Sequence, residues 1–176
     1  MERSNLRTFE PSNLRTFERS NAARIVFIRQ RCYTRYLMEV YRQTFEGRKE
    51  QLVAIHEFVD RAATELGLSD DDTFACRLAV DEAATNAFEH AYDGQPNKVE
   101  VTIQHDTDHI VLRVRNWGQP FDPEAIPEPR LDLPLDARPV GGLGIFLMKK
   151  YMDQVSFESD AEKGNTVTMR RLLSSR

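Results

Sequence analysis

The segment Leu78–Tyr92 constrains the fold most strongly, because it combines a helical apolar pattern with regularly spaced polar residues. Glu82, Asn86 and His90 follow one another at intervals of four residues. Residues at this spacing stack on one face of a helix, about one turn apart. Apolar residues border the same face. We therefore expect a helix whose polar stripe lies at the margin of a core, where a pocket can form.

Glu82 and Asn86 have the chemistry of a site that accepts a proton and holds a metal ion. Mg2+ prefers oxygen ligands and usually keeps several waters and substrate phosphates in its coordination shell. A Glu and an Asn on a helix are, however, more often parts of a solvated surface. The spacing alone leaves both interpretations open.

The amino-acid composition is that of an ordinary globular domain and does not resemble that of a nucleic-acid-binding protein. The chain has 176 residues, of which 40% are apolar and 30% charged, enough for one domain with a sizeable core. No apolar run approaches the length of a membrane span. Cys32 and Cys76 form no metal or redox motif, so a cytoplasmic, reducing location is the expectation.

Residues 1–37 differ from the rest of the chain. They carry eight Arg and three Glu, a net charge of +5, whereas the remainder carries 16 Lys and Arg against 25 Asp and Glu, a net charge of −9. The heptapeptide Ser4–Glu10 recurs as Ser12–Glu18, and such a short repeat is typical of low-complexity sequence. We expect 1–37 to be a disordered, dispensable arm, with Met38 as the biological start and 38–176 as the domain. An acidic domain binds nucleic acid poorly.

The order of periodic segments predicts an α+β fold. Period-2 alternation indicates strands, and apolar residues at helical spacing indicate helices. The predicted elements, in order, are a strand at 37–44, a helix at 48–66, a helix beginning after Ser69, strands at 98–104 and 109–115, a helix at 141–151, and strands at 154–159 and 166–172. We expect a two-layer α/β sandwich, with a mixed, mostly antiparallel sheet and helices on one of its faces.

A long proline-rich segment interrupts this order at residues 119–140. It contains six prolines, Pro120, Pro123, Pro127, Pro129, Pro134 and Pro139. Long loops in compact domains are often lids or binding loops. The alternative is a passive spacer.

Three glycine-containing segments complete a set of four sequence boxes. Asn116-Trp117-Gly118 lies where a predicted strand ends, Gly141–Gly144 opens a predicted helix, and Gly164–Thr168 begins the last strand. A helix that opens with glycines offers backbone N–H groups to an anion without obstruction by side chains. A glycine-rich turn alone is weak evidence for a phosphate site, because it also occurs at ordinary helix starts.

Together with Asp81–Tyr92, these boxes resemble the Bergerat-fold (GHKL) ATPases, the superfamily of gyrase, heat-shock chaperone, mismatch-repair and histidine kinase ATP-binding domains. The motifs Glu82-x-x-x-Asn86, Gly118-x-Pro120-Phe121-Asp122-Pro123 and Gly142-Leu143-Gly144 are most similar to the anti-sigma factor/serine-protein kinase group. The resemblance covers about residues 38–173.

The resemblance implies a role for each matching position. Glu82 would be the general base, and Asn86 would hold Mg2+ between the protein and the ATP phosphates. Gly118 would let the backbone approach adenine, Gly142 and Gly144 would shape the phosphate end of the lid, and Thr166 would support the adenine edge. For His90 a structural hydrogen bond is preferred to a catalytic role. ATP and Mg2+ are the implied cofactors.

Asn116 departs from the family pattern, which usually has Asp where this residue stands. The family's carboxylate accepts a hydrogen bond from the adenine amino group. Asn116 keeps a carbonyl oxygen but loses the charge and adds an NH2 donor. We expect a loss of about 1–2 kcal/mol, or roughly tenfold in ATP affinity, and a relaxed choice of adenine over guanine.

The sequence therefore predicts an anti-sigma regulatory factor with serine/threonine-protein kinase activity. The implied partners are a small anti-anti-sigma (STAS-type) protein and a sigma factor, with a homodimer as the expected assembly and no contact with nucleic acid or membrane. The alternative is a non-catalytic module that senses nucleotide, or binds none, and sequesters its partner. Glu82 and Asn86 favour the kinase, whereas Asn116 favours the module.

Overall fold

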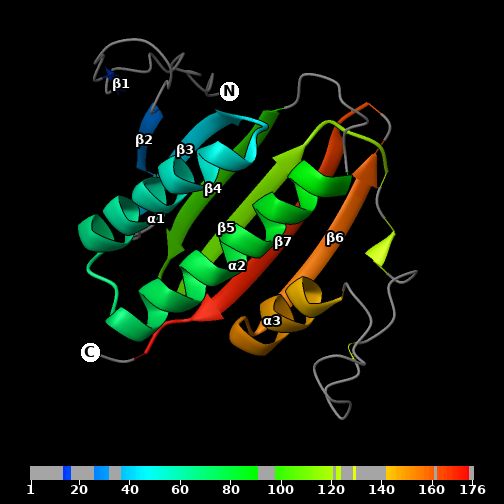
Figure 1. Ribbon diagram of the computed structural model, residues 1–176. Coiled ribbons are helices and arrows are strands. Elements are labelled where there is room, and N and C mark those ends of the chain that lie inside the picture. Colours follow the sequence, from blue (N-terminus) through cyan, green and yellow to red (C-terminus); the bar gives the residue numbers. More distant parts are fainter. Residues whose placement is uncertain are drawn as a thin grey trace, which may run out of the picture.

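The chain folds into one antiparallel sheet with helices on one of its faces. The computed structural model describes residues 14–16, 26–31, 37–90, 98–120, 122–123, 129, 142–160 and 162–174. The described strands form a seven-stranded sheet in the order β1-β2-β3-β4-β5-β7-β6. Figure 1 shows helices α1, α2 and α3 lying across the same side of this sheet.

The strands and helices have well-defined bounds. The strands are β1 (Leu14–Thr16), β2 (Val26–Arg31), β3 (Leu37–Glu46), β4 (Lys98–Asp106), β5 (His109–Asn116), β6 (Gln154–Asp160) and β7 (Gly164–Leu172). The helices are the 3-10 turn η1 (Lys49–Gln51), α1 (Leu52–Leu66), α2 (Asp70–His90) and α3 (Leu143–Tyr151).

The predicted two-layer α+β architecture is confirmed, with a more uniform sheet than expected. Every pair of neighbouring strands in the described part of the chain is antiparallel, so the expected mixture with parallel pairs is absent there. Strands β1 and β2 fall inside the segment 1–37 and pair next to β3. The division into an arm and a domain at Met38 stays a prediction.

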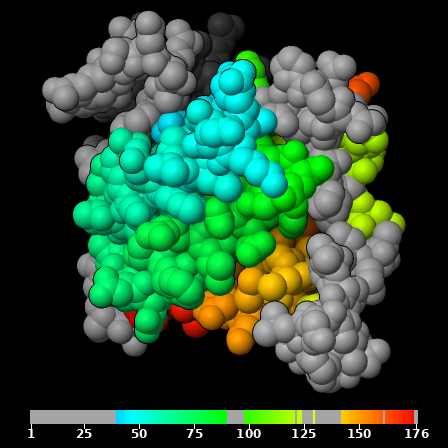
Figure 2. All heavy atoms as spheres, viewed as in Figure 1, coloured from blue at the N-terminus to red at the C-terminus, as the bar shows by residue number. Residues whose placement is uncertain are grey.

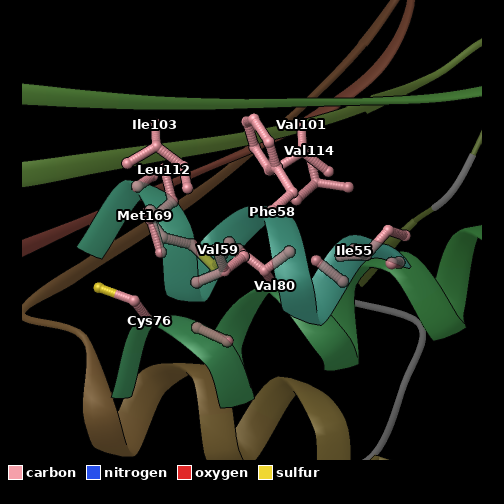
Figure 3. Close-up of a cluster of buried hydrophobic side chains, with 14 of the residues drawn as sticks. Ile55, Phe58, Val59, Cys76, Val80, Val101, Ile103, Leu112, Val114 and Met169 are labelled. Carbon is pink, nitrogen blue, oxygen red and sulfur yellow. The ribbon is translucent and has the colours of Figure 1, made fainter. Parts of the chain in front are cut away.

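The core lies between the helices and the sheet, where apolar residues of alternating strand positions meet the inner faces of α1 and α2. Figure 3 shows Phe58 and Val59 of α1 together with Val80 of α2 against strand residues. The rings of Phe45 and Phe58 meet edge to face with centroids 5.8 Å apart, a favourable aromatic geometry. The largest fully buried side chains are Phe58, Ile55, Ile103, Ile110, Leu112, Met148, Met169, Val59, Val80, Val99, Val101 and Val114.

A polar network around the buried Asp72 fixes the first turn of α2. The Asp72 backbone N–H donates to Ser69 Oγ at 3.1 Å, and the Ser69 hydroxyl donates to Asp72 Oδ2 at 2.7 Å, which is a helix N-cap. Arg171 of β7 donates to Asp72 Oδ1 at 2.8 Å and to the Tyr151 carbonyl at 2.7 Å. This network therefore ties α2 to the last strand and to the end of α3.

We expect Asp72→Asn to lower the free energy of unfolding at pH 7 by about 2–3 kcal/mol, because it leaves the Arg171 guanidinium without its buried counter-charge. Burial raises the pKa of Asp72, but hydrogen bonds from Ser69, Arg171 and Ser174 outweigh it and hold the pKa below its usual value of 3.8. A depressed pKa stabilises the fold above the unfolded-state pKa, and this contribution is lost as pH falls through the folded-state pKa.

Urea unfolding at pH 7 and pH 3 measures this difference. The gap between wild type and Asp72→Asn should shrink at pH 3. Asp71→Asn is the control, because Asp71 is exposed in the same helical turn and should change stability by only tenths of a kcal/mol, on the order of a helix-dipole effect. An undiminished gap at pH 3 would rule out Asp72 as the titrating group.

Candidate functional site

Glu82, Asn86 and Gly144 form the first part of the site, called here the α2–α3 cluster. Glu82 and Asn86 are half-buried on α2, and Gly144 lies in the first turn of α3. A Cβ atom on Gly144 would lie 2.7 Å from Glu82 Oε2 and 3.5 Å from Asn86 Nδ2. The start of α3 therefore passes close to both polar side chains, and a Cβ at position 144 would require the end of the Glu82 side chain to shift.

Gly142 shapes the start of α3. Its φ of 78° lies in the left-handed region, which glycine adopts without a steric penalty. Its carbonyl accepts the Phe146 N–H at 3.2 Å. Gly142 is the N-cap residue, and as a glycine it has no side chain to cap the helix. The first N–H groups of a helix have no acceptor within the helix, and the helix dipole makes them attractive to an anion. The start of α3 is thus suited to a phosphate group.

The surroundings of Glu82 make its carboxylate a better proton acceptor. Burial raises the pKa of Glu82, and the negative charges of Asp81 and Glu89 raise it further. Asp81 itself lies 2.7 Å from His56 Nε2. General bases work best when the pKa lies near the operating pH, so the direction of this shift favours a base role.

The second part of the site is the asparagine cluster, formed by Asn116, Gly118 and Asn165. Asn116 ends β5 on the same face as the buried Leu112 and Val114, toward the helices. Asn116 Oδ1 accepts hydrogen bonds from the Gly118 N–H at 3.1 Å and from Asn165 Nδ2 at 3.0 Å. The side-chain oxygen of Asn116 is therefore engaged by the protein itself.

Asn165 is the member of this cluster that sequence reasoning missed. It is buried, with 6% of its surface exposed, and it pairs directly with Asn116 across β5 and β7. Its NH2 group also donates to the Gln119 carbonyl at 2.7 Å, and its oxygen accepts the Ser159 hydroxyl at 2.6 Å. The sequence signal for Asn165 is the glycine before it. A Cβ on Gly164 would lie 2.2 Å from the Asn116 carbonyl oxygen, so β5 and β7 approach each other closely at this point.

Thr166 is the predicted site residue that the structure does not bring to the others. It pairs with Arg115, and directly opposed residues of neighbouring strands point to the same face of the sheet. Because alternate residues point to opposite faces, Thr166 faces away from the helices while Asn165 faces toward them. The residue beside Asn116 on the last strand is therefore Asn165, one position earlier than expected.

Helix α2, which carries Glu82 and Asn86, contacts both α3 and β5, the strand that ends at Asn116. Figure 1 shows α3 running beside α2. Asn116 is the last residue of β5. In the space-filling view, α2 and α3 adjoin on this face of the molecule (Figure 2). The predicted lid at 119–140 lies largely outside the described residues, as does the side chain of His90, so both expectations stay untested.

The donor set suits a metal that needs few protein ligands. In the part of the chain that the structure describes, no three His, Cys, Asp or Glu side chains gather to form a metal site. Mg2+ is commonly held by one or two protein oxygens together with substrate phosphates and water. The amide of Asn86, next to the phosphate-suited start of α3, fits this pattern. None of the described helices is long and apolar enough to cross a membrane.

Known proteins resemble this chain in sequence and fold. A model of the histidine kinase-like ATPase domain matches residues 45–171. Serine-protein kinase RsbW of Bacillus licheniformis is 34% identical over 120 residues, covering 63% of this chain and 71% of the relative. The enzyme of the same name from Halalkalibacterium halodurans is 30% identical over 139 residues, covering 77% and 84%. Anti-sigma F factor of Geobacillus stearothermophilus is 28% identical over 135 residues, covering 72% and 88%.

The fold has a counterpart among solved structures. The crystal structure of the RsbU and RsbW domains of a Mycobacterium tuberculosis protein aligns with a TM-score of 0.54 at 16% identity, covering 76% of this chain and 33% of that one. The family resemblance inferred from the four sequence boxes is confirmed, and the predicted functional class agrees with the relatives' names. The chain belongs to the histidine kinase-like ATPase family, in the group that contains serine-protein kinase RsbW and anti-sigma F factor.

Proposed function

We propose that this chain binds a purine nucleoside triphosphate, with ATP as the nucleotide of its family, together with Mg2+, and transfers the terminal phosphoryl group to a Ser or Thr of a small anti-anti-sigma protein. The observation that carries this proposal is the α2–α3 cluster. A carboxylate with a raised pKa and an amide that suits Mg2+ lie near Gly144 in the first turn of α3. The relatives' names, serine-protein kinase and anti-sigma factor, support the reaction class and the partners.

Each residue has a separate part in the transfer. Glu82 takes the proton of the acceptor hydroxyl as its oxygen bonds to the terminal phosphorus, while the bond from that phosphorus to the nucleoside diphosphate breaks. The N–H groups at the start of α3 bind phosphate oxygens, and Asn86 would hold Mg2+. Bound Mg2+ supplies positive charge that offsets the charge of the phosphates. Asn116 and Gly118 contact the purine ring. Asn165 takes the role that the family resemblance implied for Thr166.

The same group membership supports a proposal about the partners and the assembly. We propose that a sigma factor is the regulatory target, that a STAS-type anti-anti-sigma protein is the phosphate acceptor, and that the protein works as a cytoplasmic homodimer. A nucleotide-sensing module that sequesters its partner without phosphorylating it is the second candidate. Asn116 favours this second candidate, because it replaces the aspartate that the family usually has at the site of the purine ring.

A transfer assay separates these candidates. The full chain is incubated with Mg2+, ATP at millimolar concentration labelled on the terminal phosphate, and a small STAS-type anti-anti-sigma protein as acceptor. Label on a Ser or Thr of the small protein supports the kinase. A stable complex without label supports the sequestering module. The absence of both label and complex would contradict both candidates.

Gly144→Ala is expected to slow the transfer by roughly 10²-fold, because misplacing a catalytic group by about 1 Å has costs of this size. The added Cβ would displace the Glu82 carboxylate, whose Oε2 lies 2.7 Å from that position. The fold should survive, since alanine is favoured over glycine within a helix by about 0.5–1 kcal/mol. Rates of labelled transfer and thermal unfolding measure the two effects.

A double-mutant comparison gives the control. In a Glu82→Gln background, where the base is already absent, Gly144→Ala should have little further effect on the rate, because both changes act on the same group. Additive losses would show that Gly144 acts on something other than Glu82.

A further inference from the structure

We propose that the base site of this chain selects a 6-oxopurine, guanine or hypoxanthine, in preference to adenine. The inference rests on the proposed function, which places the purine base at Asn116. It goes beyond that function by naming the base, and it depends on which atom of the Asn116 amide remains for a ligand.

The hydrogen bonds of Asn165 fix the orientation of its own amide. Its Nδ2 lies 2.7 Å from the Gln119 carbonyl oxygen and 3.3 Å from the Gly118 carbonyl oxygen. Both carbonyls are acceptors only, so the atom that faces them must be the NH2 group. The opposite arm, the oxygen, then meets the Ser159 hydroxyl at 2.6 Å.

The orientation of Asn116 follows from that of Asn165. One arm of the Asn116 amide faces two donors, Asn165 Nδ2 at 3.0 Å and the Gly118 N–H at 3.1 Å. Exchanging the oxygen and nitrogen of Asn116 would set NH2 against both of these donors. A buried donor facing only donors costs about 1–3 kcal/mol, so the oxygen occupies this arm. The arm that remains is the NH2 group, which only donates.

The chemistry of the purine edge decides the selectivity. Adenine presents an amino donor at C6, whereas guanine and hypoxanthine present a carbonyl acceptor there. A carboxylate at position 116 would have two acceptor oxygens, one for Gly118 and Asn165 and one for the adenine amine. Asn116 offers its NH2 in place of the second oxygen. That donor opposes the adenine amine and complements the carbonyl of a 6-oxopurine.

Calorimetric titration of the full chain tests this inference, with ATP, ITP and GTP each added in the presence of Mg2+. ITP carries a 6-oxo group in place of the 6-amino group of ATP, and GTP adds a 2-amino group to ITP. Wild type should bind ITP and GTP roughly tenfold or more tightly than ATP, the size of one mismatched buried hydrogen bond. Asn116→Asp should reverse the order.

Gln104→Glu is the matched control. It makes the same amide-to-acid change on β4, where Gln104 accepts a hydrogen bond from Arg113, on the sheet face away from the helices. It should leave the wild-type order of affinities unchanged. Thermal unfolding verifies that Asn116→Asp is folded, and the comparison of ITP with ATP on wild type needs no variant at all.

The outcomes separate this inference from the proposed function. ATP binding tighter than ITP and GTP on wild type would overturn the 6-oxopurine selectivity and leave the kinase proposal standing. Binding of none of the three triphosphates would overturn both. ITP and GTP binding tighter than ATP, with reversal in Asn116→Asp, supports the assignment of Asn116 as the residue that chooses the base.

Discussion

Glu82→Gln is expected to lower the rate of phosphoryl transfer by roughly 10²–10⁴-fold, the usual contribution of a general base. Glutamine keeps the size and hydrogen-bonding shape of the side chain, so it still fits beneath Gly144. It cannot take the proton of the attacking hydroxyl. Nucleotide affinity should stay within a few-fold of wild type, since the proposed contacts to phosphate and metal come from α3 and Asn86. Single-turnover transfer at saturating nucleotide, with separate binding titrations, measures both quantities.

The pH dependence of transfer identifies the group that titrates. A base is active when deprotonated, so the rate should rise with pH through the raised pKa of Glu82. Glu89→Gln removes one of the negative charges that raise this pKa, so the acid limb should move to lower pH while the plateau rate stays near wild type. Glu89 is exposed and pairs with Lys49 at 2.7 Å, so this variant should fold. Equal plateau rates for Glu82→Gln and wild type would remove Glu82 from the base role.

Local signals predicted most of the fold. The helix predicted to begin after Ser69 does begin there, with the Asp72 N–H donating to Ser69 Oγ, and the helix predicted to end at 66 stops at Gly67, whose φ is 65°. The turn at 106–108 joins β4 to β5. Helix caps, turns and periodicity depend on residues close together in the sequence, so they can be predicted from one sequence without its tertiary structure.

Long-range geometry was harder to predict from the chain alone. The resemblance implied Thr166, two residues after Gly164, but the strand register places Asn165 opposite Asn116, and a shift of one residue moves a side chain to the other face of the sheet. The contact between Gly144 and Glu82 joins residues 62 positions apart. The hydrogen bonds that Asn116 Oδ1 accepts from Gly118 and Asn165 also depend on the pairing of β5 with β7. These features decide the chemistry of the site, and they required the structure.

Asn86→Ala is expected to remove the Mg2+-dependent part of nucleotide binding, with a loss of affinity of roughly 10²-fold in the presence of Mg2+. Even residues that only support metal ligands contribute about 10–100-fold to metal affinity. Helix α2 should remain folded, because alanine has the higher helix propensity and Asn86 is only half-buried. Titrations of the triphosphate with Mg2+ and with a chelator give the metal-dependent difference for each variant.

Asn86→Asp tests whether the oxygen is what matters. Aspartate retains an oxygen ligand at the same distance along the side chain, so it should keep a clear difference between titrations with Mg2+ and with chelator, whereas alanine should lose it. A Cβ on Gly144 would lie near both Glu82 and Asn86, yet the variants of these two residues should fail differently. Loss of Asn86 should abolish metal-dependent binding, and loss of Glu82 should abolish transfer after binding. Unchanged metal dependence in Asn86→Ala would place the Mg2+ ligand elsewhere in the chain.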